Sequence, residues 1–325
     1  MTAAMRIAVP AAIDPAALVG WDRRAGVTEL AGLTMGTTWR VRLARPRALD
    51  VADLHRAVQA LLDRLVAEMS HWEPGSVLGR FNRAPAGSWM NLPPALATVM
   101  SAGVEIAARS GGAFDPAIGG LVDLWGHGPR PVTCEPDDEE VRAALAAGGW
   151  RRLVFEEQSA RLRQPGGMCL DLSGIAKGYA VDRIAQLLAE HGVRHALVEV
   201  GGELAGRGLR PDGDPWWVDL ETPYGVAAPL RVALHDLAVA TSGDYVRGRH
   251  TIDPRSGRPV VHALAVSVVH SSAMLADAWA TALSVLPQAE MEALAIRERL
   301  ACRALVRAGG AVEWISPGLA AMLGD

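Results

Sequence analysis

The first clear pattern along the chain is an alternation of apolar and polar residues near the N-terminus. Residues Thr28 to Arg45 alternate on both sides of a small-residue turn at Met35-Gly36-Thr37, which predicts two paired strands. The next segment, Asp50 to Ser70, is typical of an amphipathic helix. Its apolar residues recur at the spacing of one helix face: Leu54, Val58, Leu61, Leu62 and Val66.

Helices and strands alternate irregularly through the rest of the chain. The pattern predicts, in order, a polar loop (71–89), a helix (93–112), a surface loop leading into a short helix (128–149), two strands around a turn (151–172), a helix (173–190), a strand (195–200), and a strand, serine cap and helix ending at Pro287 (266–287). The similar stretches HALVEVGGELA and RALVRAGGAVE each predict a hairpin around Gly-Gly. This order favours an α+β fold, with mixed or antiparallel sheets and packed helices, over regular βαβ units.

Composition limits the class of protein. The 325 residues are 50% hydrophobic with a formal net charge of −4, which allows a sizeable core and does not favour nucleic acid as a partner. The three cysteines lie far apart and indicate neither a disulfide framework nor a zinc site. Residues 1–27 are interrupted by prolines, and no stretch is long and apolar enough for a transmembrane helix. We therefore expect an N-terminal extension over 1–27 and a soluble, cytoplasmic protein.

One ionisable residue interrupts an otherwise apolar helix. The segment Ala273 to Leu286 is apolar around almost its whole circumference, and Asp277 is its only charged residue. A buried carboxylate has to meet a cation or bind a proton. Thr281 follows one turn later on the same face, so the two side chains offer hard oxygen ligands suited to Mg²⁺. The alternative is structural: Asp277 pairs with an arginine, and Thr281 bonds to its own helix backbone.

The stretch LDLSGIAKGYAVD, from Leu170 to Asp182, contains Lys177, the only lysine in the chain. It predicts a short apolar strand that turns through Asp171-Leu172-Ser173-Gly174 into a helix, where backbone N–H groups form an anion pocket. Lys177 brings a compact positive charge to a phosphate or carboxylate, where the fork of an arginine is larger and planar. The alternative is that the glycines are ordinary turn residues and the single lysine reflects base composition. Neither a Walker loop nor a GxGxxG motif is present here.

Seven motifs, in the same order along the chain, resemble the ApbE family of flavin transferases. The resemblance covers roughly Thr34 to Pro287 and is specific because the whole series occurs together. The motifs are TMGTTW (34–39), MSHWEPGSVLGRFN (69–82), SGGAFDPAIGGLVDLWGHG (110–128), LDLSGIAKGYAVD (170–182), VEVGGELAGRG (198–208), ATSGDYVRGRHTIDPRSGRPV (240–260) and ADAWATALSVL (276–286).

This resemblance implies a fold and a reaction. The fold is a single ApbE-like, T-fold-like domain over residues 28–325. The reaction is the Mg²⁺-dependent cleavage of FAD at its pyrophosphate, with transfer of FMN through a phosphoester bond to a Thr or Ser of an acceptor protein and release of AMP. The resemblance also implies that Gly174, Asp277 and Thr281 hold the metal. The family usually has Ala at the position of Gly174, but a backbone carbonyl serves as a ligand with either residue.

The resemblance assigns the remaining site residues to FAD or to catalysis. We expect His250, Asp277 and Lys177 to be catalytic, with His250 as the general base; the alternative for His250 is that it only binds FAD. The residue before His250 departs from the family, which usually has a double histidine where this chain has Arg249 and His250. The residues at positions that contact FAD in the family are Met35, His71, Trp72, Asp115, Asp171, Lys177, His250 and Thr251.

Two other functions remain open at the level of sequence. The same site, with water in place of the acceptor hydroxyl, gives an FAD pyrophosphatase that releases FMN and AMP. A flavin-binding carrier gives FAD binding without cleavage. For the transferase, the resemblance implies an acceptor with an Asp-Gly-x-Thr/Ser motif in a redox subunit or a flavin reductase, and family members are often exported.

Overall fold

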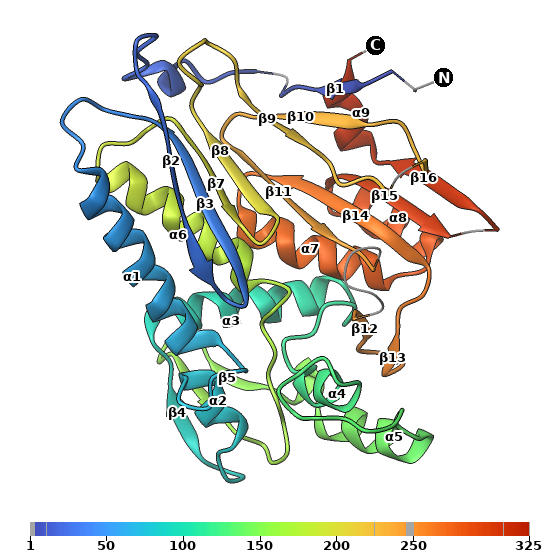
Figure 1. The fold of residues 1–325 in the computed structure, drawn as a ribbon. Helices are drawn as coiled ribbons and strands as arrows, with labels where there is room; N and C mark the ends of the chain where they lie inside the picture. Colours follow the sequence, from blue (N-terminus) through green and yellow to red (C-terminus); the bar gives the residue numbers. More distant parts are fainter. Residues whose placement is uncertain (1–3, 11, 224, 245–249, 308, 325) are drawn as a thin grey trace.

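The centre of the molecule is an antiparallel sheet (Figure 1). The structure is a computed structural model, and it describes residues 4–10, 12–223, 225–244, 250–307 and 309–324. Within these residues the central sheet has eight strands. In spatial order they are β16 (Ala311–Ile315), β15 (Ala301–Arg307), β14 (Ala263–His270), β11 (Leu237–Ser242), β8 (Glu203–Arg207), β7 (Ala196–Val200), β3 (Thr37–Ala44) and β2 (Val27–Thr34).

The three predicted hairpins are confirmed as neighbouring pairs of this sheet. Strands β2 and β3 pair from Val27↔Ala44 to Thr34↔Thr37 around Met35 and Gly36. The two Gly-Gly stretches join β7 to β8 and β15 to β16. The hydrophobic pattern is therefore a good guide wherever two strands are adjacent in sequence.

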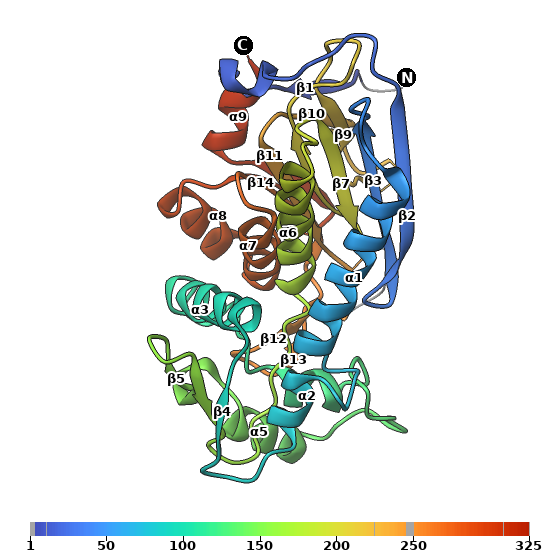
Figure 2. The same ribbon diagram turned by 90° about the vertical axis from the view of Figure 1, so that its left-hand side faces the viewer.

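Helices cover one face of the sheet, and Figure 2 shows α6, α7 and α8 stacked there. The helices of this layer are α1 (Val51–Met69), α3 (Pro94–Arg109), α6 (Ala176–Glu190), α7 (Ala273–Val285) and α8 (Gln288–Arg297). The predicted stripe of α1 is buried, except that Leu65 and Met69 take the place of the partly exposed Val66. Ser272 caps α7 by accepting the N–H of Leu275, as predicted.

A smaller layer covers the other face of the central sheet. It consists of β1 (Arg6–Ala8), β10 (Leu230–Leu234) and β9 (Trp216–Asp219), with α9 (Pro317–Leu323) beside them. Alternate residues of β7 show the two layers, because Val198 belongs to the main core and Leu197 to the smaller one. The middle of the central sheet is thus buried on both faces, whereas β2 and β3 expose Glu29, Arg40 and Arg42 on one face. The architecture confirms the predicted α+β class with antiparallel sheets and packed helices.

The remaining elements form the part of the molecule below the sheet in Figure 1. They are α2 (Val77–Asn82), β4 (Trp89–Asn91), α4 (Gly119–Leu124), α5 (Asp138–Ala147), β5 (Val154–Glu156), β6 (Arg161–Arg163), β12 (Ile252–Asp253) and β13 (Arg258–Pro259), with short 3₁₀ turns at Trp150–Arg152 and, near the N-terminus, Pro15–Leu18. The predicted polar loop over 71–89 is wrong in part, since it contains α2 and the start of β4. Ser76 begins α2 by accepting the N–H of Gly79.

The two strands predicted around a turn are confirmed as β5 and β6, but the short apolar strand predicted at residues 168–170 is wrong. Met168 and Leu170 are buried, but the segment joins no sheet among the described residues. Two side chains and a neighbouring loop satisfy its backbone instead. Asn82 bonds to the N–H and the carbonyl of Leu170, and Gln164 does the same for Met168. Backbone groups of Gly119 and Pro116 bond to Cys169 and Asp171. A buried apolar run of this length resembles a strand in sequence whichever partner its backbone has.

The N-terminal segment joins the fold through β1. Strand β1 pairs in parallel with β10, and the N–H of Val9 donates to the carbonyl of Met322. The division of the chain at residue 27 stays a prediction. No helix within the described residues is long and apolar enough to span a membrane.

Candidate active site

Two glycines bring the start of α6 against α7. A Cβ atom built on Gly178 lies 2.8 Å from Cβ of Asp277, and one built on Gly174 lies 2.9 Å from Oγ1 of Thr281. Each glycine thus faces one residue of the predicted Asp–Thr pair at a distance that a larger residue would disturb. Gly174 and Gly178 are four residues apart, as are Asp277 and Thr281, so one face of the segment 174–178 packs against one face of α7.

The carboxylate of Asp277 is buried at this contact. The residue is 5% exposed, and its Oδ2 accepts the backbone N–H of Gly178 at 3.0 Å. Burial raises the pKa of Asp277 above its ordinary value, and the positive charge of Lys177 opposes the shift. The cation that acts on Asp277 is therefore a lysine, where the structural alternative expected an arginine.

A second buried carboxylate, Glu203, lies on the other side of Lys177. The Lys177 ammonium donates a hydrogen bond to Oε1 of Glu203. Burial raises the pKa of Glu203 to about 7, although the charge of Lys177 acts in the opposite direction. The sequence analysis did not identify Glu203 as a site residue. Its signal was a single acidic residue directly after the Gly-Gly turn, in a hairpin that is otherwise apolar on its buried face.

The turn before α6 differs from the prediction in its starting point. Asp171 accepts the N–H of Ser173 at 2.7 Å, and residues 173–175 form a turn, so α6 begins at Ala176 instead of Ser173. The N–H of Ala176 donates to the carbonyl of Leu172 and that of Gly178 to Asp277. Several N–H groups of the expected anion pocket are thus used within the protein.

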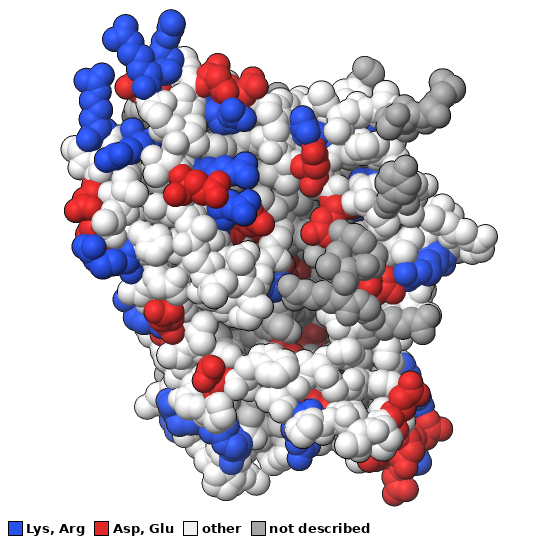
Figure 3. Space-filling model, in the orientation of Figure 1, with Lys and Arg blue, Asp and Glu red and all other residues white. Residues whose placement is uncertain are grey.

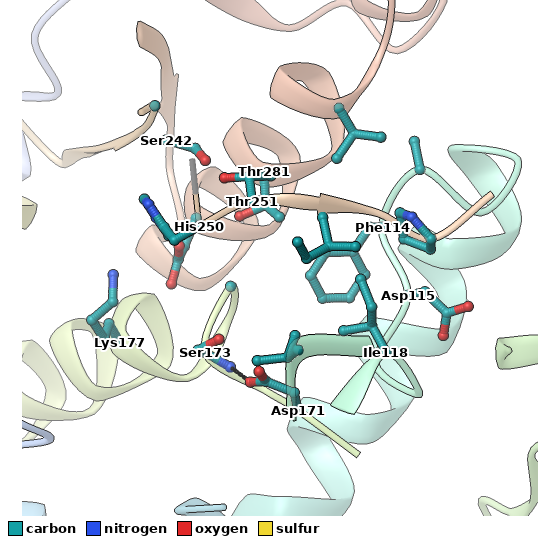
Figure 4. A pocket seen from close by; sticks show the side chains of 18 of the residues that line it. Phe114, Asp115, Ile118, Asp171, Ser173, Lys177, Ser242, His250, Thr251 and Thr281 are labelled. Atoms are coloured by element: carbon teal, nitrogen blue, oxygen red, sulfur yellow. Dashed lines mark hydrogen bonds between the residues drawn. The ribbon is translucent and has the colours of Figure 1, made fainter. Parts of the chain in front are cut away.

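Asp115 lines the cavity from the opposite side. Its two oxygens accept the N–H groups of Ala117 and Trp150 at 2.8 and 2.9 Å, which joins two loops. Burial raises the pKa of Asp115 to about 6. Figure 4 shows Asp115 and Lys177 at opposite ends of the pocket.

These residues surround a cavity of about 250 Å³. Figure 3 shows the face of the molecule that is hollowed near its centre, with acidic side chains visible at depth. The cavity includes most of the predicted site, and Figure 4 shows Thr281, Thr251 and His250 above Asp171 and Lys177. The predicted residues that line it are Asp115, Asp171, Gly174, Lys177, His250, Thr251, Asp277 and Thr281.

Met35, His71 and Trp72 lie outside this lining. His71 is one side chain away, with Nδ1 at 3.6 Å from Oδ1 of Asp171. Trp72 is 56% exposed beside His71, and Met35 lies in the β2–β3 turn with φ of 49°. Ligand pockets commonly measure about 300–1,000 Å³, so this cavity holds only part of a dinucleotide. Contacts between FAD and these three residues stay a prediction.

His250 stands where β12 begins. Its ring lies edge to face against His127, with centroids 6.5 Å apart. The carbonyl of the next residue, Thr251, accepts the N–H of Val260, which fixes the start of the β12–β13 hairpin. Arg249, the departure noted beside His250, lies outside the described residues.

The donor set at Asp277 suits a magnesium ion. A carboxylate, the Thr281 hydroxyl and a glycine carbonyl are hard oxygen donors, the type that Mg²⁺ prefers. Two carboxylates share one ammonium here, and Oε2 of Glu203 is buried with no hydrogen-bond partner among the described residues. Within the described part of the pocket, this excess of negative charge also favours a cation. Within the described part of the chain no three His, Cys, Asp or Glu residues form a metal-binding group. The set proposed here contains only one such residue, Asp277, together with a hydroxyl and a carbonyl.

A larger cavity of about 560 Å³ lies at the other end of α6. Asp182, on α6, lines this cavity. Its oxygens accept hydrogen bonds from Ser272, Ala273 and Met274 at the start of α7. This carboxylate therefore serves as a helix cap. Size alone does not identify the chemical site, and the smaller cavity is the candidate.

The fold and the site together define an α+β protein with a charged, magnesium-compatible pocket between two helices. Comparison with known proteins identifies its family. The ApbE family model matches residues 35–306, and the chain belongs to the ApbE family.

Relatives and solved structures agree with this family. A Klebsiella pneumoniae (strain 342) protein named FAD:protein FMN transferase is 35% identical over 307 residues, 89% of this chain and 87% of the relative. The flavin transferase ApbE from Vibrio cholerae has a TM-score of 0.87 at 32% identity, over 92% of this chain and 99% of that one. The apo flavinyl transferase ApbE of Pseudomonas stutzeri has a TM-score of 0.86 at 36% identity, over 93% and 98%.

Proposed function

We propose that this protein is an FAD:protein FMN transferase. It cleaves FAD at the pyrophosphate, joins FMN to a Thr or Ser hydroxyl of an acceptor protein through a phosphoester bond, and releases AMP in a Mg²⁺-dependent reaction. The observation that supports this most directly is the pocket at the α6–α7 contact, which combines an ammonium, buried carboxylates and a hydroxyl. The relatives named above carry out flavin transfer according to their names.

Transfer of a phosphoryl group depends mainly on positioning and charge neutralisation. Asp277, Thr281 and the carbonyl of Gly174 would hold Mg²⁺, which when bound supplies positive charge for the pyrophosphate oxygens. Lys177 adds a fixed ammonium at the same end of the cavity. Asp171 stabilises the turn that presents Gly174, through its bond to the N–H of Ser173.

His250 is the residue to accept the proton of the acceptor hydroxyl, because neutral imidazole is a base near pH 7. The hydroxyl oxygen then forms a bond to the FMN phosphorus. The bond from that phosphorus to the bridging oxygen breaks, and the oxygen leaves as part of AMP. Asp115 is occupied by two backbone N–H groups, so its role is to shape the flavin side of the cavity.

The experiment uses the whole chain, FAD, MgCl₂ and a soluble acceptor domain that carries an Asp-Gly-x-Thr sequence. We expect the mass of the acceptor to rise by one FMN, AMP to form in equal amount, and both to stop with a chelator. An acceptor with Val in place of its Thr is the matched control and should gain no mass. Release of free FMN without acceptor labelling would instead identify a pyrophosphatase, and binding of FAD without cleavage would identify a carrier.

A further inference from the structure

The β7–β8 hairpin brings Glu203 directly against Lys177. The two strands are joined by Gly201 and Gly202, which have φ of 62° and 106°, and Val200 pairs with Glu203. A Cβ atom built on Gly201 lies 3.3 Å from Cδ of Lys177. The turn therefore packs against the stem of the lysine, and Glu203 follows it as the first residue of β8.

Glu203 is buried deeply for a charged residue. It is 3% exposed, whereas the Lys177 side chain is 20% exposed. One oxygen accepts the Lys177 ammonium, and the other is buried with no partner among the described residues. Such a carboxylate is costly to bury for stability alone, which indicates another role.

We propose that Glu203 is a positioning residue that holds the Lys177 ammonium beside Asp277, at the diphosphate end of the pocket. Lysine has four rotatable side-chain bonds, so an unanchored ammonium would occupy many positions. The Lys177 ammonium, which has three N–H donors, acts on both carboxylates. It donates a hydrogen bond to Glu203, and its positive charge opposes the rise in the pKa of Asp277 that burial causes. This inference rests on the proposed function for its kinetic consequence, but the position of Lys177 can be measured without it.

The single lysine makes that measurement direct. Protein labelled with ¹³C-lysine, and carrying no lysine in its purification tag, gives one set of lysine Cε–Hε signals. All of these signals come from Lys177. In the wild type we expect two distinct Hε shifts, because the ammonium is held in one place. Glu203→Gln keeps the size of the side chain but removes its charge, and should merge the two shifts toward those of a mobile lysine. Glu199→Gln, on the same hairpin, is the control and should leave them apart.

The kinetic test separates positioning from a structural role. We expect Glu203→Gln to lower kcat for FMN transfer by about 10- to 100-fold, the usual effect of removing a residue that orients a functional group, with a smaller change in KM for FAD. Glu203→Asp keeps the charge and should recover part of the loss. In a Lys177→Met background, Glu203→Gln should cause no further loss, because the group through which it acts is gone.

Two results would overturn the inference: lysine signals that are the same in the wild type and in Glu203→Gln, or losses that simply add in the double variant. A wild type that shows the anchored lysine but labels no acceptor would refute the proposed function and leave the positioning role standing. The outcomes for the two proposals are therefore distinct.

Discussion

Two ionic clusters in this molecule, each built around a buried charged residue, have opposite electrostatics. The pocket cluster consists of Lys177, Glu203 and Asp277. The Arg303 cluster, at the β15–β16 edge of the sheet, consists of Arg303, Arg6 and Glu313. The first has two carboxylates and one cation, and the second has two cations and one carboxylate.

The Arg303 cluster is well satisfied at its deepest point. Arg303 is 1% exposed, and its three guanidinium nitrogens donate to Glu313, to Oγ1 of Thr222 and to the carbonyl of Ala228, at 2.7–2.8 Å. Burial alone would raise the pKa of Glu313, but the hydrogen bonds and charges of Arg6 and Arg303 outweigh it and lower that pKa. The ionised form of Glu313 is thus stabilised by the fold itself.

The pocket cluster shows the reverse. Burial raises the pKa of both carboxyl groups, and one oxygen of Glu203 has no partner among the described residues. Among the described residues, Lys177 is the cation that acts on both carboxylates. A buried charge whose hydrogen bonds are complete, as for Arg303, serves the structure, whereas a cluster short of positive charge among the described residues is a candidate site for a cation.

The sharpest test of this comparison is Asp277→Asn. We expect it to lower the rate of FMN transfer by about 10²–10³-fold. The variant lacks the carboxylate that would hold Mg²⁺ beside the phosphate, where negative charge develops in the transition state. The free energy of unfolding should stay the same or rise, since a carboxylate that is costly to bury is replaced by a neutral group. Acceptor labelling by mass spectrometry and urea unfolding measure the two effects. Full transfer by the variant would contradict the metal assignment.

Arg303→Met should show the opposite combination. We expect it to cost about 1–3 kcal/mol of unfolding free energy, because the buried acceptors at Thr222 and Ala228 lose their donors. Glu313 keeps its hydrogen bonds to Arg6. FMN transfer per folded molecule should be retained, as the Arg303 cluster is not among the residues that line the pocket. Urea unfolding checks the first effect, and labelling below the transition checks the second.

Arg231→Met is the matched control for Arg303→Met. Arg231 forms an exposed pair with Asp219 between β10 and β9, and such pairs contribute little to stability. We expect its unfolding curve to overlay that of the wild type. A loss of stability equal to that of Arg303→Met would mean that burial does not distinguish the two pairs.

The sequence predicted the local parts of this fold well. The β2–β3 hairpin, the stripe of α1 and the capped helix α7 are all encoded by residues close together in the chain. The errors lie where distant groups decide. Residues 168–170 resemble a strand, but the side chains of Asn82 and Gln164 and the backbone of Gly119 satisfy their backbone. Asp171 delays the start of α6.

The site residues show the same division between features that are local in sequence and features that depend on distant residues. Asp277 and Thr281 are one helical turn apart, so their shared face could be read directly. Glu203 could not be found in this way, because its partner Lys177 is 26 residues away and meets it only through the packing of the hairpin on α6. The Gly-Gly turn was correctly interpreted as a hairpin, but nothing local shows which side chain it directs into the pocket.

Binding of Mg²⁺ should itself stabilise the fold, by an amount that depends on pH. Glu203 has a pKa of about 7 when folded, above its ordinary 4.5. Between these values the native state binds more protons than the unfolded state, so without metal this group makes stability fall as pH rises from about 4.5 to 7. The raised pKa of Asp277 acts in the same direction. Mg²⁺ should offset the fall, because it supplies the missing positive charge once the carboxylates are ionised.

We expect Mg²⁺ at ten to a hundred times its Kd to raise the free energy of unfolding by about 1.4–2.7 kcal/mol at pH 8. At pH 5 the gain should be smaller, because protons compete for the same carboxylates. Thermal unfolding in MgCl₂, against NaCl of equal ionic strength, measures both. Asp277→Asn should lose the gain, whereas Asp182→Asn, at the cap of the same helix, should keep it. An equal gain at both pH values, or one that persists without Asp277, would place the metal elsewhere and remove the contrast between the two clusters.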